Sequence, residues 1–196
     1  MSTAARFALL AALTLTAAGA AHAQPKVNYV TVGGQLIALP VPDGFLDPRS
    51  VRPATARTID AVTPVDNRNL SYLVPPEDLA RLESQARVLK VEISKQYEDK
   101  DFPPPAFEAF REDLRKSQPP NMEHVRIFDE TRYSISRVTI GAGRATAASL
   151  VYIRGKVLYV ISSAAGTDPD AVLWTQAMSH SFVRLILEAN QQPVKD

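Results

Sequence analysis

The chain has 196 residues, of which 45% are hydrophobic and 22% are charged, a composition typical of a folded domain with an apolar core. Its 22 Lys and Arg residues nearly balance its 21 Asp and Glu residues, so no overall field favours binding to nucleic acid or to an anionic membrane. The absence of Cys excludes disulfides, thiolate metal sites and a cysteine nucleophile.

The first 23 residues have the three parts of a secretory signal peptide. A positive residue, Arg6, precedes an apolar stretch from Phe7 to Ala18, and the small-x-small triplet Ala21-His22-Ala23 follows. The apolar stretch is shorter than the roughly 20 residues that cross a bilayer, which disfavours a membrane anchor. We therefore expect cleavage between Ala23 and Gln24, a periplasmic or secreted product, and no stable membrane insertion after the signal is removed.

The first elements of the mature chain are short. The segment from Val27 to Pro40 contains two strand-like runs around Gly33-Gly34, which predicts a hairpin because glycine readily adopts the positive φ of a tight turn. A short helix is predicted from Pro53 to Val62, since proline is tolerated in the first turn of a helix. A strand at Leu70–Val74 and a brief helix from Pro75 to about Ala86 complete this region.

The segment from Arg87 to Gln96 alternates in polarity, with Leu89, Val91 and Ile93 on one side and Lys90, Glu92 and Ser94 on the other. This pattern predicts a strand that is covered on one face only. After three consecutive prolines, Phe107, Phe110 and Leu114 recur at helical spacing among charged residues. They predict an amphipathic helix that ends before Pro119.

Three further strands are predicted at Thr131–Ile140, Ala145–Ile153 and Val157–Ser162. Their connections at 141–144 and 154–156 are too short for anything but antiparallel pairing, so the three strands form a meander. In the last strand both alternating sets of side chains are apolar, which indicates a strand covered on both faces.

A long C-terminal helix is available to cover one of those faces. Its start is marked by Thr167-Asp168-Pro169-Asp170, which supplies a capping residue, a proline for the first turn and acidic side chains at the positive end of the helix. An apolar stripe follows at Trp174, Met178, Phe182, Leu185, Ile186 and Ala189. Residues 24–196 are therefore expected to form one α/β/α sandwich domain of the α+β class, with a mainly antiparallel sheet and helices on both faces.

The order of these elements, together with the segments LIALPVPDGF, SLVYIRGKVLYVIS and LWTQAMSHSFVRLILEAN, resembles the Mog1/PsbP-like α/β/α sandwich of uncharacterised exported bacterial proteins. Proteins with that fold include small-GTPase-binding proteins and extrinsic subunits of photosystem II. The resemblance therefore implies non-catalytic binding, although it brings no functional residue with it.

Candidate catalytic residues are few, because His124 and His180 are the only histidines left once the signal is removed. His124 follows two prolines and is expected in a loop, whereas His180 is expected on the solvent side of the C-terminal helix, near Arg184 and Glu188. The sequence around Ser162-Ser163 lacks the G-x-S-x-G nucleophile elbow of hydrolases. We predict no catalytic residue, and the alternative is a periplasmic hydrolase with His180 or His124 as general base.

Other charged clusters favour ordinary surface roles. The acidic run at 98–101 contains Lys100 and lacks the glycine and distant glutamate of an EF-hand loop, while Glu112 stands four residues before Lys116, at ion-pair spacing. Gly141-Ala142-Gly143 is explained by a turn. Basic residues occur near one loop (Arg49, Arg52 and Arg57) and at one hairpin tip (Arg154 and Lys156), without the aromatic residues of a nucleic-acid platform.

Taken together, these patterns predict an exported binding or accessory protein that acts through contacts with another protein or an envelope component. No cofactor and no metal are predicted, since no ligand set with suitable spacing occurs.

Overall fold

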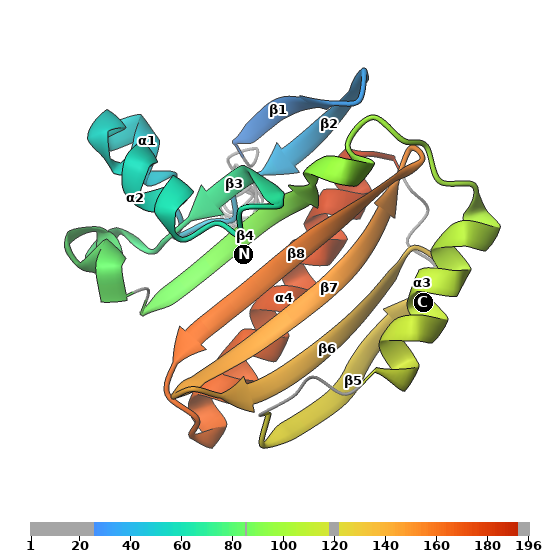
Figure 1. The fold of residues 1–196 in the computed structure, drawn as a ribbon. Coiled ribbons are helices and arrows are strands. Elements are labelled where there is room, and N and C mark those ends of the chain that lie inside the picture. Colours follow the sequence, from blue (N-terminus) through green and yellow to red (C-terminus); the bar gives the residue numbers. More distant parts are fainter. Residues whose placement is uncertain (1–25, 85, 118–121, 192–196) are drawn as a thin grey trace, which may run out of the picture.

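The computed structural model describes residues 26–84, 86–117 and 122–191, which fold around two antiparallel sheets (Figure 1). The smaller sheet is a hairpin of β1 (Val27–Val32) and β2 (Gln35–Pro40). The larger sheet has six strands in the order β3-β4-β8-β7-β6-β5. These strands are β3 (Asn67–Leu73), β4 (Arg87–Ser94), β5 (His124–Thr131), β6 (Ser134–Gly141), β7 (Arg144–Ile153) and β8 (Lys156–Ala165).

Helices lie on both faces of the larger sheet. The α-helices are α1 (Pro48–Val51), α2 (Ala56–Ala61), α3 (Pro104–Lys116) and α4 (Pro169–Ala189). Short 3-10 helices occur at η2 (Pro53–Thr55), η3 (Pro76–Ser84) and η4 (Lys95–Tyr97). Helix α4 crosses one face of the sheet and α3 lies on the other, beside β5 and β6 (Figure 1). The predicted α/β/α sandwich with a long C-terminal helix is therefore confirmed.

Strand β8 explains why the sheet needs two helical layers. It lies between β4 and β7, and its side chains point alternately to the two faces. Leu158 and Val160 are fully buried with Phe182 of α4, whereas Val157 packs with Phe107 of α3 on the other face. An apolar run on both alternating sets is stable only in this sandwiched position.

Helix α4 begins at the predicted cap, where the Asp168 carboxylate accepts a hydrogen bond from the Ala171 N–H at 3.0 Å. Its buried stripe is rotated from the predicted one. Trp174 and Met178 are only partly buried, while Thr175 and Ser179 are fully buried against the sheet. The small side chains let the helix approach the strands closely, as a 3.0 Å hydrogen bond between Ser179 and Ser149 shows.

The N-terminal hairpin forms as predicted, with Gly33 and Gly34 both at positive φ. Gly33 is also required by space, because a Cβ there would lie 2.2 Å from the Glu98 carbonyl oxygen. The C-cap of α4 holds strand β2 through Asn190, whose amide oxygen accepts from Ala38 N–H at 3.0 Å and whose amide nitrogen donates to Ala38 O at 2.8 Å. The buried Asn190 side chain thus pairs with β2 as a neighbouring strand would.

The prediction that β4 is covered on one face only is wrong. Glu92 is fully buried, and the Lys90 ammonium, which lies 3.3 Å from the Glu92 carboxylate, is on a side chain only 13% exposed. Asn67 also donates to Glu92 at 2.8 Å. The polar face of β4 is therefore internal, and its charges are tolerated because they contact one another.

The strand predicted at Thr131–Ile140 is present as β6, from Ser134 to Gly141, but the sequence does not predict β5, which precedes it. The chain turns at residues 132–133 and separates β5 from β6, so the predicted three-stranded meander has a fourth strand at its edge. A bulge between Ile127 and Asp129 interrupts the alternation of β5, which hides the strand from a period-two pattern. His124 begins β5 and does not lie in a loop.

The predicted signal peptide at 1–23 and the cleavage point between Ala23 and Gln24 lie outside the described residues. In the part of the chain that the structure describes, no helix combines the length and the apolar character that crossing a membrane requires.

Candidate functional site

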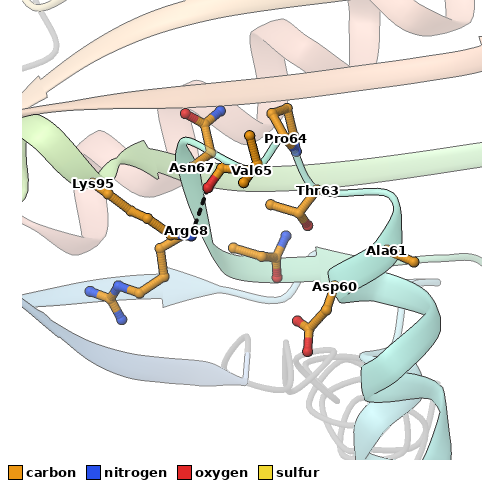
Figure 2. Close-up of a pocket in the computed structure, with 9 residues that line it drawn as sticks. Asp60, Ala61, Thr63, Pro64, Val65, Asn67, Arg68 and Lys95 are labelled. Carbon is orange, nitrogen blue, oxygen red and sulfur yellow. Dashed lines mark hydrogen bonds between the residues drawn. The ribbon is translucent and has the colours of Figure 1, made fainter.

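A polar hollow of about 510 Å³ lies beside strand β3, where helix α2 ends (Figure 2). Helix α2 ends because Pro64 follows two residues after its cap at Val62, and the chain then turns into β3 through a 2.9 Å hydrogen bond from Asn67 N–H to Pro64 O. Lys95 closes one side, since its Nζ donates to Val65 O at 2.7 Å. The hollow is lined by Asp60, Ala61, Thr63, Pro64, Val65, Asn67, Arg68, Asn69 and Lys95.

A second hollow, of about 400 Å³, lies between β1, α1 and the same stretch of β3. It is lined by Lys26, Asn28, Val30, Asp47, Arg49, Ser50, Arg68, Asn69 and Leu70. Both hollows share Arg68 and Asn69, so they adjoin at this dipeptide. We refer to the two together as the β3 trough.

Arg68 is fixed between the two sheets. Its guanidinium pairs with the Glu98 carboxylate at 2.6 Å, and Nη2 donates to the Thr31 carbonyl of β1 at 2.9 Å. The side chain remains 37% exposed, so its charge faces solvent while its position is set by the hairpin and the η4 loop. An arginine held in this way presents a preorganised cation to a ligand.

Asn69 stands at a bulge, because the pairing register of β3 with β4 shifts between Asn69 and Ser71. Its amide donates to Ser71 O at 3.2 Å, while its amide oxygen accepts from Arg49 at 3.5 Å. Arg49 is in turn held by Asp47, the N-cap of α1, at 2.7 Å. Bulges turn side chains away from the regular pleat, and this one occurs where the two hollows meet.

The trough carries more positive than negative charge. The cations that line it are Lys26, Arg49, Arg68 and Lys95, and the carboxylates are Asp47 and Asp60. Among the described residues that line it, none is aromatic. The arrangement can hold an anionic, hydrogen-bonding ligand, but it offers no ring on which a sugar or a nucleobase would stack.

A smaller hollow of about 240 Å³ lies between α3 and the sheet. It is lined by Tyr97, Phe110, Asp113, Leu114, Ser117, Leu150, Val157 and Tyr159. Burial is the main cause that raises the pKa of Tyr159, and Tyr97 adds a smaller effect in the same direction, so the Tyr159 phenol is neutral at pH 7. This hollow suits an apolar side chain or a small apolar molecule.

His180 is the residue that the hydrolase alternative requires. Its Nδ1 lies 3.0 Å from the Asp129 carboxylate of β5, a contact that sequence reasoning missed because it missed that strand. The His180 side chain is 50% exposed, and no hydrogen bond between it and a serine occurs among the described residues. Neighbouring Ser179 points into the core. The described residues thus place an orienting carboxylate beside the imidazole, with no serine hydroxyl hydrogen-bonded to it.

Of the other catalytic candidates, Ser162 and Ser163 are not assembled with His180. The backbone of His124 starts β5, but its side chain lies outside the described residues. Ser163 is held by Thr146 at 3.0 Å and by Arg144 at 3.1 Å. Ser162 is fully buried, so solvent does not reach its hydroxyl.

The acidic run at 98–101 is used in structural contacts. Glu98 pairs with Arg68, and Asp101 lies 2.9 Å from the Nζ of Lys156. Lys156, expected at an accessible hairpin tip, is fully buried, because its ammonium also donates to Glu98 O and Lys100 O. Across the three described ranges, no group of three or more metal-ligating side chains occurs.

The remaining candidates occupy surface or turn positions. Glu112 lies 3.9 Å from Lys116, at the predicted spacing, and also pairs with Arg115. Gly141-Ala142-Gly143 forms the turn between β6 and β7, with Ala142 and Gly143 at positive φ. Of the predicted basic loop residues, Arg49 lines the trough, whereas Arg52 and Arg57 are exposed outside its lining.

The chain is similar to several solved structures, including one from yeast and one from a cyanobacterium. The Ran-binding protein Mog1p of Saccharomyces cerevisiae is 14% identical, with 85% of this chain and 93% of that chain covered and a TM-score of 0.38. The cyanobacterial PsbP (CyanoP) of Synechocystis sp. PCC 6803 is 12% identical, with 87% and 96% covered and a TM-score of 0.39. Both belong to the Mog1/PsbP-like group that the sequence resembles. Similarity at this level carries nothing about function.

No protein-family model and no curated protein sequence matches the chain.

Proposed function

We propose that the chain is an exported, non-catalytic binding or accessory protein that acts through contacts with a protein or an envelope component. A signal peptide of residues 1–23 is removed between Ala23 and Gln24, and residues 24–196 remain as one domain in the periplasm or outside the cell. The sequence of the first 23 residues supports export.

The observation that carries the binding function is the β3 trough. Its polar side chains converge from β1, α1, the end of α2, β3 and η4, and several of them are fixed by hydrogen bonds to backbone carbonyls. Concave sites with a few fixed polar groups are typical of ligand and partner binding. The trough is open on the surface. It therefore suits a partner that stays partly exposed to solvent when bound better than a substrate that must be enclosed.

Export is tested by expressing the full chain and a variant without residues 1–23 in a Gram-negative host. We expect the full chain in the periplasmic fraction with a mature N-terminus at Gln24, as intact mass measures, and the truncated variant in the cytoplasm. Export of the truncated variant, or retention of the full chain with residues 1–23 attached, would contradict the proposal.

Binding is tested with a photo-crosslinking residue placed at Val65, which is 82% exposed at the rim of the trough, and with a matched control at Leu173, which is 62% exposed on α4. A partner of the trough should give a discrete adduct at position 65 that is absent at position 173. Equal adducts at both positions would indicate non-specific contact and contradict a specific role of the trough.

The hydrolase alternative remains because of one observation, the 3.0 Å contact between His180 and Asp129. It predicts that His180→Ala abolishes hydrolysis of an activated ester by the purified protein. The binding proposal predicts no hydrolysis above the buffer rate before or after the substitution. Hydrolysis that is saturable and lost in His180→Ala, with His124→Ala as a comparison, would favour the enzyme.

A further inference from the structure

We infer that the β3 trough binds an extended acidic peptide segment of a partner protein, an inference that rests on the proposed binding function. The shape of the trough is the first reason. Two hollows of about 510 and 400 Å³ adjoin at Arg68 and Asn69 of β3. One extends toward the end of α2 and the other toward β1. An elongated site of this kind fits a stretched chain better than a compact molecule.

The second reason is the open edge of β3. Strand β3 is the edge of the six-stranded sheet, and its outer side is paired, within the described residues, by one isolated bridge between Leu46 and Val74 beyond its far end. The stretch from Asn67 to Leu70 lines the trough. An edge strand offers backbone donors and acceptors to an extended segment, as in peptide recognition by strand addition.

The third reason is charge. Four cations line the trough against two lining carboxylates, and the Glu98 carboxylate that pairs with Arg68 is a third, so the balance remains positive by one charge. The described contacts of Arg68 use Nε and Nη2, and the described contact of Lys95 uses one of its three ammonium donors. Both cations therefore retain the capacity to donate to the carboxylates of a ligand.

The chemistry of the lining selects among anions. The amide of Asn28 can donate to or accept from a peptide backbone, which a simple inorganic anion does not need, whereas the amides of Asn67 and Asn69 are held by Glu92, Ser71 O and Arg49. The lining is not aromatic in the described part of the chain, so a nucleic acid strand would lack a stacking surface. An acidic peptide satisfies both the charge and the Asn28 amide.

The test uses a fluorescein-labelled octapeptide of alternating glutamate and serine, titrated with the mature chain and followed by anisotropy. The same peptide with glutamine in place of glutamate is the uncharged comparison. We expect the acidic peptide to bind at least about tenfold more tightly than the glutamine peptide, and to weaken between about 0.05 M and about 0.3 M salt because exposed charges are screened.

Two substitutions locate the site. Lys95→Glu reverses a rim charge on an exposed side chain, and Asn69→Asp adds a carboxylate at the bulge without changing size. Each should weaken binding of the acidic peptide, by about tenfold for Lys95→Glu because one charge is reversed next to the ligand. The matched control is Lys116→Glu on α3, 76% exposed, which should change the affinity less than about twofold.

The inference fails if the glutamate and glutamine peptides bind equally, if Lys95→Glu and Lys116→Glu have equal effects, or if inorganic phosphate at matched charge displaces the peptide completely. It also fails if the free chain dimerises through Lys95, since a second copy would then be the occupant. These results do not decide the proposed function. If the titration fails while position 65 still crosslinks to a partner, the binding role stands and only the acidic peptide is excluded.

Discussion

Strand β3 belongs to two regions of opposite character. Leu73 is fully buried in the core that α4 covers, whereas Arg68 and Asn69, a few residues earlier on the same strand, line an open polar trough. The register shift between Asn69 and Ser71 separates the two halves. One edge strand thus serves packing at one end and presents charged side chains at the other.

The two regions differ in what holds them. Between α4 and the sheet, buried apolar side chains such as Phe182, Ile186 and Leu158 contribute roughly 1.5–3 kcal/mol each on burial. In the trough, hydrogen bonds run from partly exposed cations to carbonyls and carboxylates, and such contacts contribute little to stability. Substitutions should therefore distinguish the two regions. Those between α4 and the sheet should lower the free energy of unfolding, whereas those in the trough should alter binding.

The largest effect is expected for Phe182→Ala in the first region. Phe182 is 0% exposed in the cluster that joins α4 to the sheet, so its truncation should lower the free energy of unfolding by about 3–5 kcal/mol through lost burial and a cavity. Urea unfolding followed by circular dichroism measures this. The matched control is Leu173→Ala on the same helix, 62% exposed, which should change stability by less than about 0.5 kcal/mol. Equal losses would contradict the assignment of the covered face.

An intermediate effect is expected at Lys156, which links the two regions. Its buried ammonium holds Glu98 O at 3.0 Å and Lys100 O at 3.1 Å, and Glu98 in turn pairs with Arg68 in the trough. Lys156→Met should destabilise the chain by about 1–3 kcal/mol, because these carbonyls lose their donor. Thermal unfolding measures the loss.

The same variant should weaken acidic peptide binding, since Arg68 loses part of its support. Lys116→Met is the control, because its side chain is 76% exposed and should affect neither property. Normal stability in Lys156→Met would mean that water replaces the ammonium, and the link between core and trough would be wrong.

Much of the sandwich could be predicted from sequence because its signals are local. Gly33-Gly34 specified the hairpin, the doubly apolar β8 specified a covered central strand, and Asp168 specified the start of α4. Strand β5 was missed because it is a bulged edge strand with mixed polarity. The wrong face assigned to β4 has a related cause, since Lys90 and Glu92 read as solvent-facing until their mutual contact is seen.

The candidate site was largely invisible in the sequence. Arg49 stands out in the sequence as a basic loop residue, but it meets Arg68 and Asn69 of β3 and Lys95 of η4 only because β3 pairs with β4 and the hairpin returns beside them. No spacing within one segment signals such convergence. The contact of His180 with Asp129 is equally invisible in the sequence, because the two residues lie on separate elements. Lys156 is a different case, since lysines near hairpin tips are generally exposed and this one is buried.

The smallest effect is expected at the opposite edge of the sheet, where Glu130 of β5 accepts hydrogen bonds from Arg111 and Arg115 of α3. Bonding from Arg115 is the largest cause that lowers the pKa of Glu130 below its ordinary value of 4.5. A lowered pKa in the folded chain stabilises it above about pH 4.5, and this contribution is lost as the pH falls through the folded-state pKa. Glu130→Gln should therefore reduce stability by about 0.2–1 kcal/mol at pH 7, because the pair is partly exposed.

The difference between the wild-type chain and Glu130→Gln, measured by urea unfolding from pH 7 to about pH 3, should shrink as the pH falls below about 4.5, because the carboxylate of the unfolded chain is then protonated and the lowered folded-state pKa stabilises the chain less. Binding of the acidic peptide at the β3 trough should be unaffected at pH 7, since Glu130 lies at the other edge of the sheet. A difference that grows on acidification would mean that the pKa of Glu130 is higher in the folded chain than in the unfolded chain, contrary to the pairing with Arg115. A change in peptide affinity would mean that the two edges are coupled through the strands between them, and the separation of packing from binding would then not hold.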